Sequence, residues 1–222
     1  MCFSAEASFG ASATLLTIGI VSARKSRNTP QYMLASIPII FGVQQFVEGI
    51  LWLSLSHQVF SLWHNMATYA FLIFAQVVWP VLLPLAVTLL EKDTRKRNAM
   101  SVFLAMGVFI SSYLAYCLLF YDVGSSISCS HIRYDVHYPI RIKHLGILYF
   151  AVTVIPPVIS SIKRLRLLGV VIFVSYVVTK IFYEDYLISV WCFFATIISI
   201  IALSVIIQLN KPPKLTDVNL PA

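Results

Sequence analysis

Long apolar runs alternate with short polar links along the whole of this 222-residue chain. Each run is close to the twenty or so residues that a helix needs to cross the hydrocarbon core of a bilayer. Open sheet edges do not survive in lipid, and the runs lack the alternation typical of barrel strands, so each run is predicted to be a helix. The seven expected spans are 7–23, 32–55, 66–90, 100–121, 144–162, 167–185 and 187–209.

The polar part of the chain is too small to cover a water-soluble domain. Hydrophobic residues make up 59% of the chain and charged residues only 11%, which indicates that the solvent is lipid. The predicted fold class is therefore an all-α membrane protein, with a single seven-helix transmembrane bundle over residues 1–210. The one long link, residues 122–143, is expected to form an outer loop that caps the mouth of the bundle. Residues 211–222 are expected to form a cytoplasmic tail.

Basic residues are distributed unevenly between the links. By the positive-inside rule, the face that collects them is cytoplasmic, so the N-terminus is predicted to lie outside and the C-terminus in the cytoplasm. The positive charge is interpreted as topology and attraction to anionic lipid headgroups, and not as a nucleic-acid surface. Twelve of the sixteen Lys and Arg residues fall in the first, third and fifth links and in the tail: Arg24, Lys25, Arg27, Lys92, Arg95, Lys96, Arg97, Lys163, Arg164, Arg166, Lys211 and Lys214.

Prolines interrupt two of the expected spans. Pro80 and Pro84 lie in the third span, and Pro156 and Pro157 lie in the fifth. A proline inside a helix frees a backbone carbonyl, which at this depth only a protein neighbour or a wet cavity can satisfy. Two packed kinks are the favoured interpretation, and a cavity lined by ligand contacts is the alternative.

Polar residues inside the second and sixth spans are the sharpest candidates for a site. Gln45, Glu48 and Trp52 share one face of the second span at i, i+3 and i+7. A carboxylate within a span is costly unless it is paired, protonated or bound to a cation, so Glu48 is expected to face the bundle interior. In the sixth span Lys180 and Glu184 are one turn apart and can pair. Their pairing near the headgroups is the favoured interpretation, and a functional buried lysine is the alternative.

Small polar residues form stripes on the first and last spans. Close helix packing is the favoured explanation for both stripes, with Cys192 as a ligand or nucleophile the alternative. The first stripe consists of Ser4, Ser8 and Ser12, near Cys2 and Glu6, and the last of Ser189, Cys192, Thr196 and Ser199, beside Trp191.

The reactive side chains map to the outer third of the predicted bundle, which suggests a polar pocket that opens outward. Thiol, imidazole and carboxylate groups are also the ligands of zinc, and Glu48, His64 and His144 are the candidate metal ligands. No cofactor is fixed by the sequence beyond this candidate zinc. The residues in the outer third are Cys2, Glu48, His64, His144, Lys180, Glu184 and Cys192.

Three segments carry a resemblance to a known family: MCFSAEAS at the start, FGVQQFVEGILW in the second span and SVWCFFATIIS in the last. The chain resembles a family of uncharacterised bacterial integral membrane proteins, which implies a multi-pass protein of the bacterial inner membrane. The resemblance brings no established activity. It implies that Met1 is the true start and that the family pattern includes Cys2, Ser4, Gln45, Glu48, Trp52, Trp191 and Cys192.

Three functions are consistent with this pattern. The first is binding of a lipid-like or small amphipathic ligand in the outward-facing pocket, lined by Gln45, Glu48, Trp52, Lys180, Glu184, Trp191, Cys192, Cys2 and Ser4. The second is a metal-dependent intramembrane hydrolase acting on lipid, with Glu48 as the candidate catalytic residue, although no HExxH motif is present. The third is a small transporter, which the nearly apolar cytoplasmic half disfavours. The sequence predicts membrane lipid as a partner and does not fix an oligomeric state.

Overall fold

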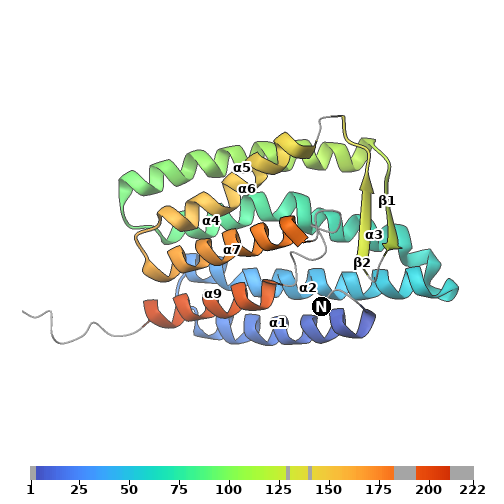
Figure 1. Cartoon of the computed structure of the whole chain (residues 1–222). Helices are drawn as coiled ribbons and strands as arrows, with labels where there is room; N and C mark the ends of the chain where they lie inside the picture. The colour runs from blue at the N-terminus through green and yellow to red at the C-terminus, as the bar shows by residue number, and fades with distance from the viewer. Residues whose placement is uncertain (1–3, 129–130, 140–141, 183–193, 211–222) are drawn as a thin grey trace, which may run out of the picture.

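The computed structural model describes residues 4–128, 131–139, 142–182 and 194–210 of the chain. Its helices lie side by side in one bundle, and a small hairpin crosses one end of it (Figure 1). Among the described residues, six helical rods are single α-helices: α1 (Ala5–Lys25), α2 (Thr29–Ser56), α5 (Thr94–Phe120), α6 (Ile142–Ile159), α7 (Lys163–Phe182) and α9 (Ala195–Leu209).

The third rod is composite. A 3-10 helix, η1 (Gln58–Trp63), leads into α3 (His64–Leu72), then into a π-helix, η2 (Ile73–Val78), and finally into α4 (Trp79–Leu90). Within the described residues, this rod and α1, α2, α5 and α7 are each long and apolar enough to cross a membrane, whereas α6 and α9 are apolar but shorter. The chain is thus a largely helical, multi-pass membrane protein, as the hydrophobic pattern predicts.

A two-stranded sheet is the main departure from the all-α expectation. Strand β1 (Val123–Ser128) pairs antiparallel with β2 (His131–Val136), so that Ser125 lies opposite Tyr134. The hairpin falls within the segment expected as an outer loop and crosses the end of the bundle beside α3 (Figure 1). The ring of Tyr134 stacks on Phe71 of α3 with ring centroids 4.9 Å apart, which attaches the hairpin to the helices.

Helices α1 and α2 pack closely because their contact faces carry small residues. Ser8 and Ser12 of α1 are buried, and the Ser12 hydroxyl donates to the backbone carbonyl of Gly42 at 2.8 Å. A Cβ added to Gly49 would lie 2.7 Å from the ring of Phe9, so the glycine is what permits this approach. Close packing, the favoured interpretation of the first serine stripe, is confirmed for Ser12.

The π-helix ends two residues before Pro80, the first of the two prolines of the third rod. Pro80 has no N–H, and in π geometry the bond it cannot make is the one to the carbonyl five residues earlier, that of Ala75. The hydroxyl of Tyr149 on α6 donates to that carbonyl at 2.6 Å, and Ser111 on α5 donates to the carbonyl of Val77 at 2.7 Å. Side chains of neighbouring helices satisfy these carbonyls, which agrees with the packed-kink interpretation at Pro80.

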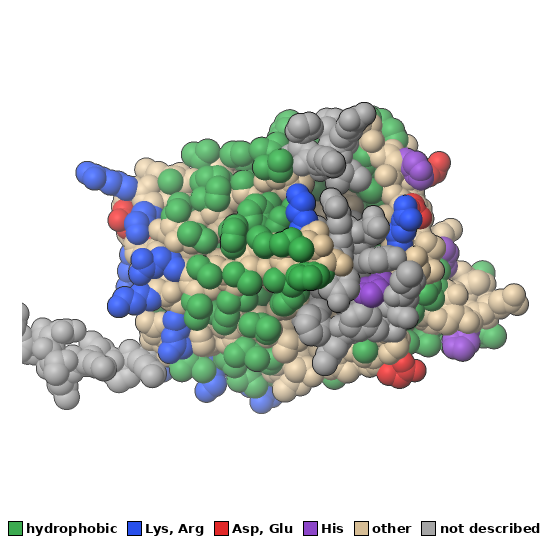
Figure 2. Space-filling view, in the orientation of Figure 1, with side chains coloured by type: hydrophobic (Ala, Val, Ile, Leu, Met, Phe, Trp, Pro, Cys, Tyr) green, Lys and Arg blue, Asp and Glu red, His purple; other side chains and the backbone are tan. Residues whose placement is uncertain are grey.

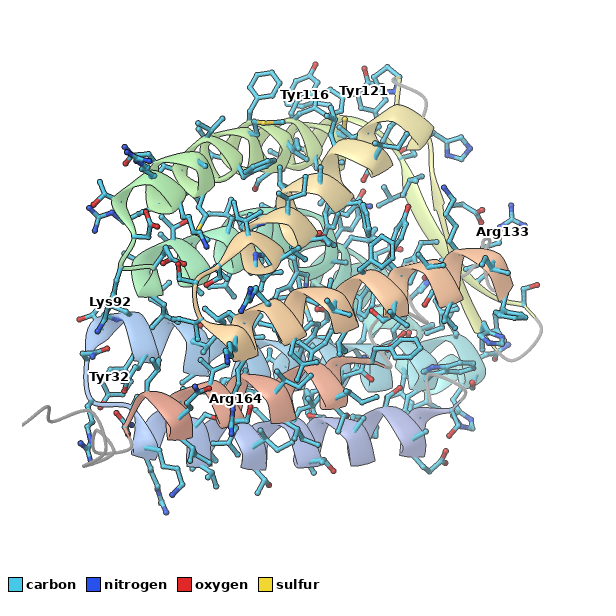
Figure 3. All side chains as sticks on the ribbon, turned by 60° about the vertical axis from the view of Figure 1, so that its left-hand side comes forward. Tyr32, Lys92, Tyr116, Tyr121, Arg133 and Arg164 are labelled. Carbon is cyan, nitrogen blue, oxygen red and sulfur yellow. The ribbon has the colours of Figure 1, made fainter. Side chains whose placement is uncertain are left out.

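The two ends of the bundle differ in charge. Lys and Arg side chains gather at the end away from the hairpin, and an apolar belt lies between the ends (Figure 2). Lys92 and Arg164 lie at this basic end, whereas Arg133 lies at the hairpin end (Figure 3). The expected basic links therefore do share one face of the bundle.

A buried carboxylate joins two links at the basic end. Glu91 Oε1 accepts from the backbone N–H groups of Lys92 and Asp93, each at 3.1 Å. Its Oε2 accepts from the Ser160 hydroxyl at 2.9 Å and from the Ser161 N–H at 2.8 Å. Burial acts to raise the pKa of Glu91, but these hydrogen bonds outweigh it, and the pKa is held below its ordinary value.

Candidate functional site

Three successive turns of α2 place polar side chains inside the bundle. Glu48 and Gln45 are 0% and 1% exposed, and the Gln45 amide donates to Glu48 Oε2 at 2.8 Å. The i, i+3 spacing that predicted a shared face thus produces a direct hydrogen bond. Gln45 thus supplies the Glu48 carboxyl with a hydrogen-bond donor inside the bundle.

A second polar contact connects α2 to the composite rod. The Trp79 indole N–H donates to Gln44 Oε1 at 2.8 Å, and the Trp79 ring stacks on Phe41 with centroids 3.9 Å apart. The composite rod and α2 are antiparallel. Residues that precede Trp79 in the rod therefore lie level with residues that follow Gln44 in α2. Glu48 therefore lies at the depth of the π-helix.

The other side of the π-helix is also polar. Gln76, buried in η2, accepts a hydrogen bond from the Tyr138 hydroxyl at 2.6 Å through its Oε1. Burial raises the pKa of Tyr138, which therefore stays a neutral donor. With the bonds from Tyr149 and Ser111 to the π-helix backbone, these contacts form a polar layer across α2, η2, α5 and α6. A polar layer at this depth is unusual in a membrane bundle, where such residues mark functional sites by default.

Two buried donors at the level of Glu48 have no acceptor among the described residues. Trp52 is 6% exposed and lies one turn beyond Glu48 on the same face, but its indole N–H is unpaired. Ser8 is 0% exposed, and its hydroxyl also finds no partner in the described part of the chain. Because Ser12 contacts Gly42 in the antiparallel α1–α2 pair, Ser8 lies about one turn nearer the hairpin, level with Gln45 and Glu48.

Apolar side chains of α3 and the hairpin pack around Trp52. Trp52 packs in a buried cluster with Leu51, Phe71, Ile132 and Tyr134, which belong to α2, α3 and β2. The side of the site towards the hairpin is therefore apolar, whereas the side formed by Gln45 and Glu48 is polar. Such an arrangement suits a molecule with one polar end.

His64 has a structural partner in the hairpin. Its Nε2 lies 2.9 Å from the Ser125 hydroxyl, which also lies 2.8 Å from the Thr68 hydroxyl. Glu48 and His64, two of the three candidate metal ligands, thus engage Gln45 and Ser125 respectively. The described side chains include no group of three His, Cys, Asp or Glu residues that could hold a metal, and the side chain of the third candidate, His144, lies outside them.

The remaining predicted site residues are placed as follows. Ser4 is the N-cap of α1, and its hydroxyl accepts from the Ala7 N–H at 3.2 Å. Lys180 is exposed, and its ammonium lies 5.9 Å from the centre of the Tyr176 ring, within the range of a cation–π contact. Cys2, Glu184, Trp191 and Cys192 lie outside the described residues.

A comparison with family models decides the relationship of this chain to known proteins. A model described as a family of unknown function (DUF6629) matches residues 1–217. The chain belongs to DUF6629. No curated protein and no solved structure matches it.

Several residues of the polar layer in this DUF6629 protein were not singled out from the sequence. They are Gln44, Gln76, Trp79, Tyr138 and Tyr149. A signal existed for Gln44 and Gln76, because each amide falls inside an apolar span and such residues usually face the bundle interior. No local pattern connects Tyr138 or Tyr149 to the third rod, because their contacts are made across 62 and 74 residues of sequence.

Proposed function

We propose that this DUF6629 protein binds a small amphipathic, lipid-like molecule in a site bounded by Gln45, Glu48, Trp52 and Ser8. The observation that carries the proposal is the unpaired indole N–H of buried Trp52, one helical turn from a buried carboxyl. Leaving a buried donor unsatisfied costs about 1–3 kcal/mol, which an oxygen atom of a ligand would offset.

The chemistry of the site favours a hydroxyl-bearing head. A hydroxyl oxygen accepts from the Trp52 indole, and the hydroxyl hydrogen donates to Glu48. The cluster around Phe71 and Ile132 would take up the apolar body of the same molecule. No observation on the described residues favours the metal-dependent hydrolase or the transporter.

The proposal puts this site toward the outside of a bacterial inner membrane. The site lies at the level of the π-helix and towards the hairpin, away from the basic links, which the positive-inside rule assigns to the cytoplasm. Lys180, Glu184, Trp191, Cys192, Cys2 and Ser4 complete the predicted lining as part of the proposal.

Mass spectrometry of small molecules retained through purification tests the proposal. Wild type, Glu48→Gln and Trp52→Phe would be purified in one detergent, with Glu6→Gln as control because Glu6 is exposed on α1 and receives the same chemical change. We expect one amphiphile in wild type and in Glu6→Gln, reduced about tenfold in the other two variants, as the loss of roughly 1.4 kcal/mol predicts. The same retained molecules in all four proteins would refute the site.

A further inference from the structure

An apolar groove lies between α6 and α7, on the half of the bundle that carries the basic links. Its volume is about 370 Å³, and its lining is entirely apolar: Phe150, Val154, Ile155, Val158, Val170 and Phe173. Val154 is buried, whereas Val158, Val170 and Phe173 are exposed, so the groove opens from the bundle towards the surrounding lipid. It is separate from the site proposed around Glu48, since none of its lining residues belongs to that site.

Packing of the two helices determines the extent of the groove. At Gly169 the helices touch, because an added Cβ would lie 2.7 Å from Val158 Cγ2. At the other end, the rings of Phe150 and Phe173 have centroids 5.7 Å apart. Phe173 is ten residues after Lys163, the first residue of α7, which is roughly 15 Å of helix. The far end of the groove thus lies about one leaflet deep from the start of α7, in a bilayer whose hydrocarbon core is about 30 Å thick. Its lining on α6, from Phe150 to Val158, extends over roughly 12 Å of helix.

Two cations lie on the same stripe of α7 as the groove. Lys163, Arg166, Val170 and Phe173 are spaced i, i+3, i+7 and i+10, which places them on one face of the helix. Lys163 and Arg166 are exposed, and the one ion pair within the described residues, Arg133 with Asp135, involves neither.

Arg164, the third basic residue at the start of α7, bonds to a neighbouring helix. Arg164 Nη1 donates to the Ser204 carbonyl of α9 at 2.6 Å, and Figure 3 shows this arginine between the two helices. Of the three basic residues at the start of α7, only Lys163 and Arg166 are therefore available beside the groove.

From this arrangement we propose that the α6–α7 groove is a binding site for one anionic phospholipid of the leaflet at the basic end. One acyl chain occupies the groove from Val158 to the Phe150–Phe173 pair. The phosphate and an anionic headgroup lie over Lys163 and Arg166, where each cation strengthens the binding of an anionic lipid by about fivefold. The ligand is a phospholipid and not a free phosphate, because the larger part of the site is apolar.

Native mass spectrometry of the purified protein with equal amounts of phosphatidylglycerol and phosphatidylethanolamine, carrying identical acyl chains, tests the headgroup contact. We expect wild type to prefer phosphatidylglycerol by about thirtyfold and Lys163→Gln/Arg166→Gln to lose this preference. The matched control is Lys92→Gln/Arg95→Gln, which removes one Lys and one Arg, also at i, i+3 and exposed, from another link at the same end. Loss of preference in both double variants, or in neither, would overturn the proposal.

A second variant tests the acyl chain contact. Val170→Trp fills the groove at an exposed position, and Val102→Trp adds the same bulk to an exposed valine of α5. Only Val170→Trp is expected to lower phosphatidylglycerol binding, by roughly tenfold, because it blocks the groove. The unfolding temperature should be unchanged in both variants. Equal binding by the two variants would overturn the proposal. Glu48→Gln should keep the lipid preference, which separates this result from that of the Glu48 site.

Discussion

Gln45 donates its side-chain amide to Glu48 Oε2 at 2.8 Å, and both side chains are almost completely buried in α2. The buried Gln45 amide needs a hydrogen-bond acceptor, and the Glu48 carboxyl can accept this hydrogen bond in either protonation state. This bond survives in a Glu48→Gln variant, because the new amide still offers a carbonyl oxygen to Gln45.

The pair predicts different stabilities for two substitutions at one position. Glu48→Gln should unfold at a temperature close to that of wild type, whereas Glu48→Leu should lose about 1–3 kcal/mol because the buried Gln45 amide loses its acceptor. Thermal unfolding of the purified protein in one detergent measures both. A Glu48→Leu variant as stable as Glu48→Gln would show that the Gln45 bond contributes little to the fold.

Glycines at two positions should respond in opposite ways to the same substitution. A Cβ at Gly107 of α5 would overlap the carbonyl oxygen of Pro80, whereas nothing lies within 4 Å of a Cβ at Gly10 of α1. Gly107→Ala should therefore destabilise the protein by about 1–3 kcal/mol, and Gly10→Ala should stabilise it by up to about 1 kcal/mol. Unfolding temperatures of the two variants test this, and a neutral Gly107→Ala would mean that α4 and α5 separate easily.

The Glu91 carboxylate should make stability depend on acid. Its pKa is below the ordinary value of 4.5, because four hydrogen bonds to the charged form outweigh burial. A lowered folded-state pKa contributes stability that is present above 4.5 and is lost as the pH falls through the folded-state pKa. Glu91→Gln should be less stable than wild type at neutral pH, and its unfolding temperature should fall less steeply in acid.

A surface carboxylate provides the control for Glu91. The side chain of Asp135 is 44% exposed and pairs with Arg133 at 3.1 Å, and such surface pairs contribute roughly 0–1 kcal/mol. Asp135→Asn should therefore keep the acid dependence of wild type. If Glu91→Gln also kept it, other carboxylates would have to be responsible.

Orientation of the bundle is predicted by charge and can be measured directly. In a chain whose native cysteines are replaced, Arg133→Cys lies in the hairpin and Arg95→Cys lies in the first turn of α5, at opposite ends of the bundle. A membrane-impermeant thiol reagent applied to intact cells should label Arg133→Cys and not Arg95→Cys. The reverse pattern would place the Glu48 site on the cytoplasmic side.

The spans could be predicted from the sequence because membrane insertion depends on segment length and hydropathy, which are local. The third span shows the limit of this reasoning, since its hydrophobic run from 66 to 90 gives no sign of the π-helix at Ile73–Val78. That helix depends on where Pro80 falls and on whether Tyr149 and Ser111 are present to donate to the carbonyls of Ala75 and Val77. These partners come from other helices.

The hairpin was unpredicted for a related reason. The segment VGSSIS is rich in Gly and Ser, which have low strand propensity, and it forms β1 because it pairs with β2 and packs on α3. The candidate site was also predictable only in part. Helical spacing predicted the Gln45–Glu48 pair, whereas the bond from Trp79 to Gln44 required two helices to be placed side by side.

The hydroxyl of Tyr149 should stabilise the π-helix of the third rod. It donates to the Ala75 carbonyl, for which Pro80 provides no N–H, so Tyr149→Phe leaves that carbonyl without its donor at a depth where water is scarce. We expect a loss of about 1–2 kcal/mol in Tyr149→Phe.

Tyr116→Phe makes the same chemical change on α5 at a side chain that is 50% exposed, and it should change stability by less than about 0.5 kcal/mol. Thermal unfolding of both variants gives the comparison, and hydrogen exchange should rise in 73–78 only for Tyr149→Phe. If the two variants behaved alike, the π-helix would be held by the α4–α5 contact and not by this hydroxyl.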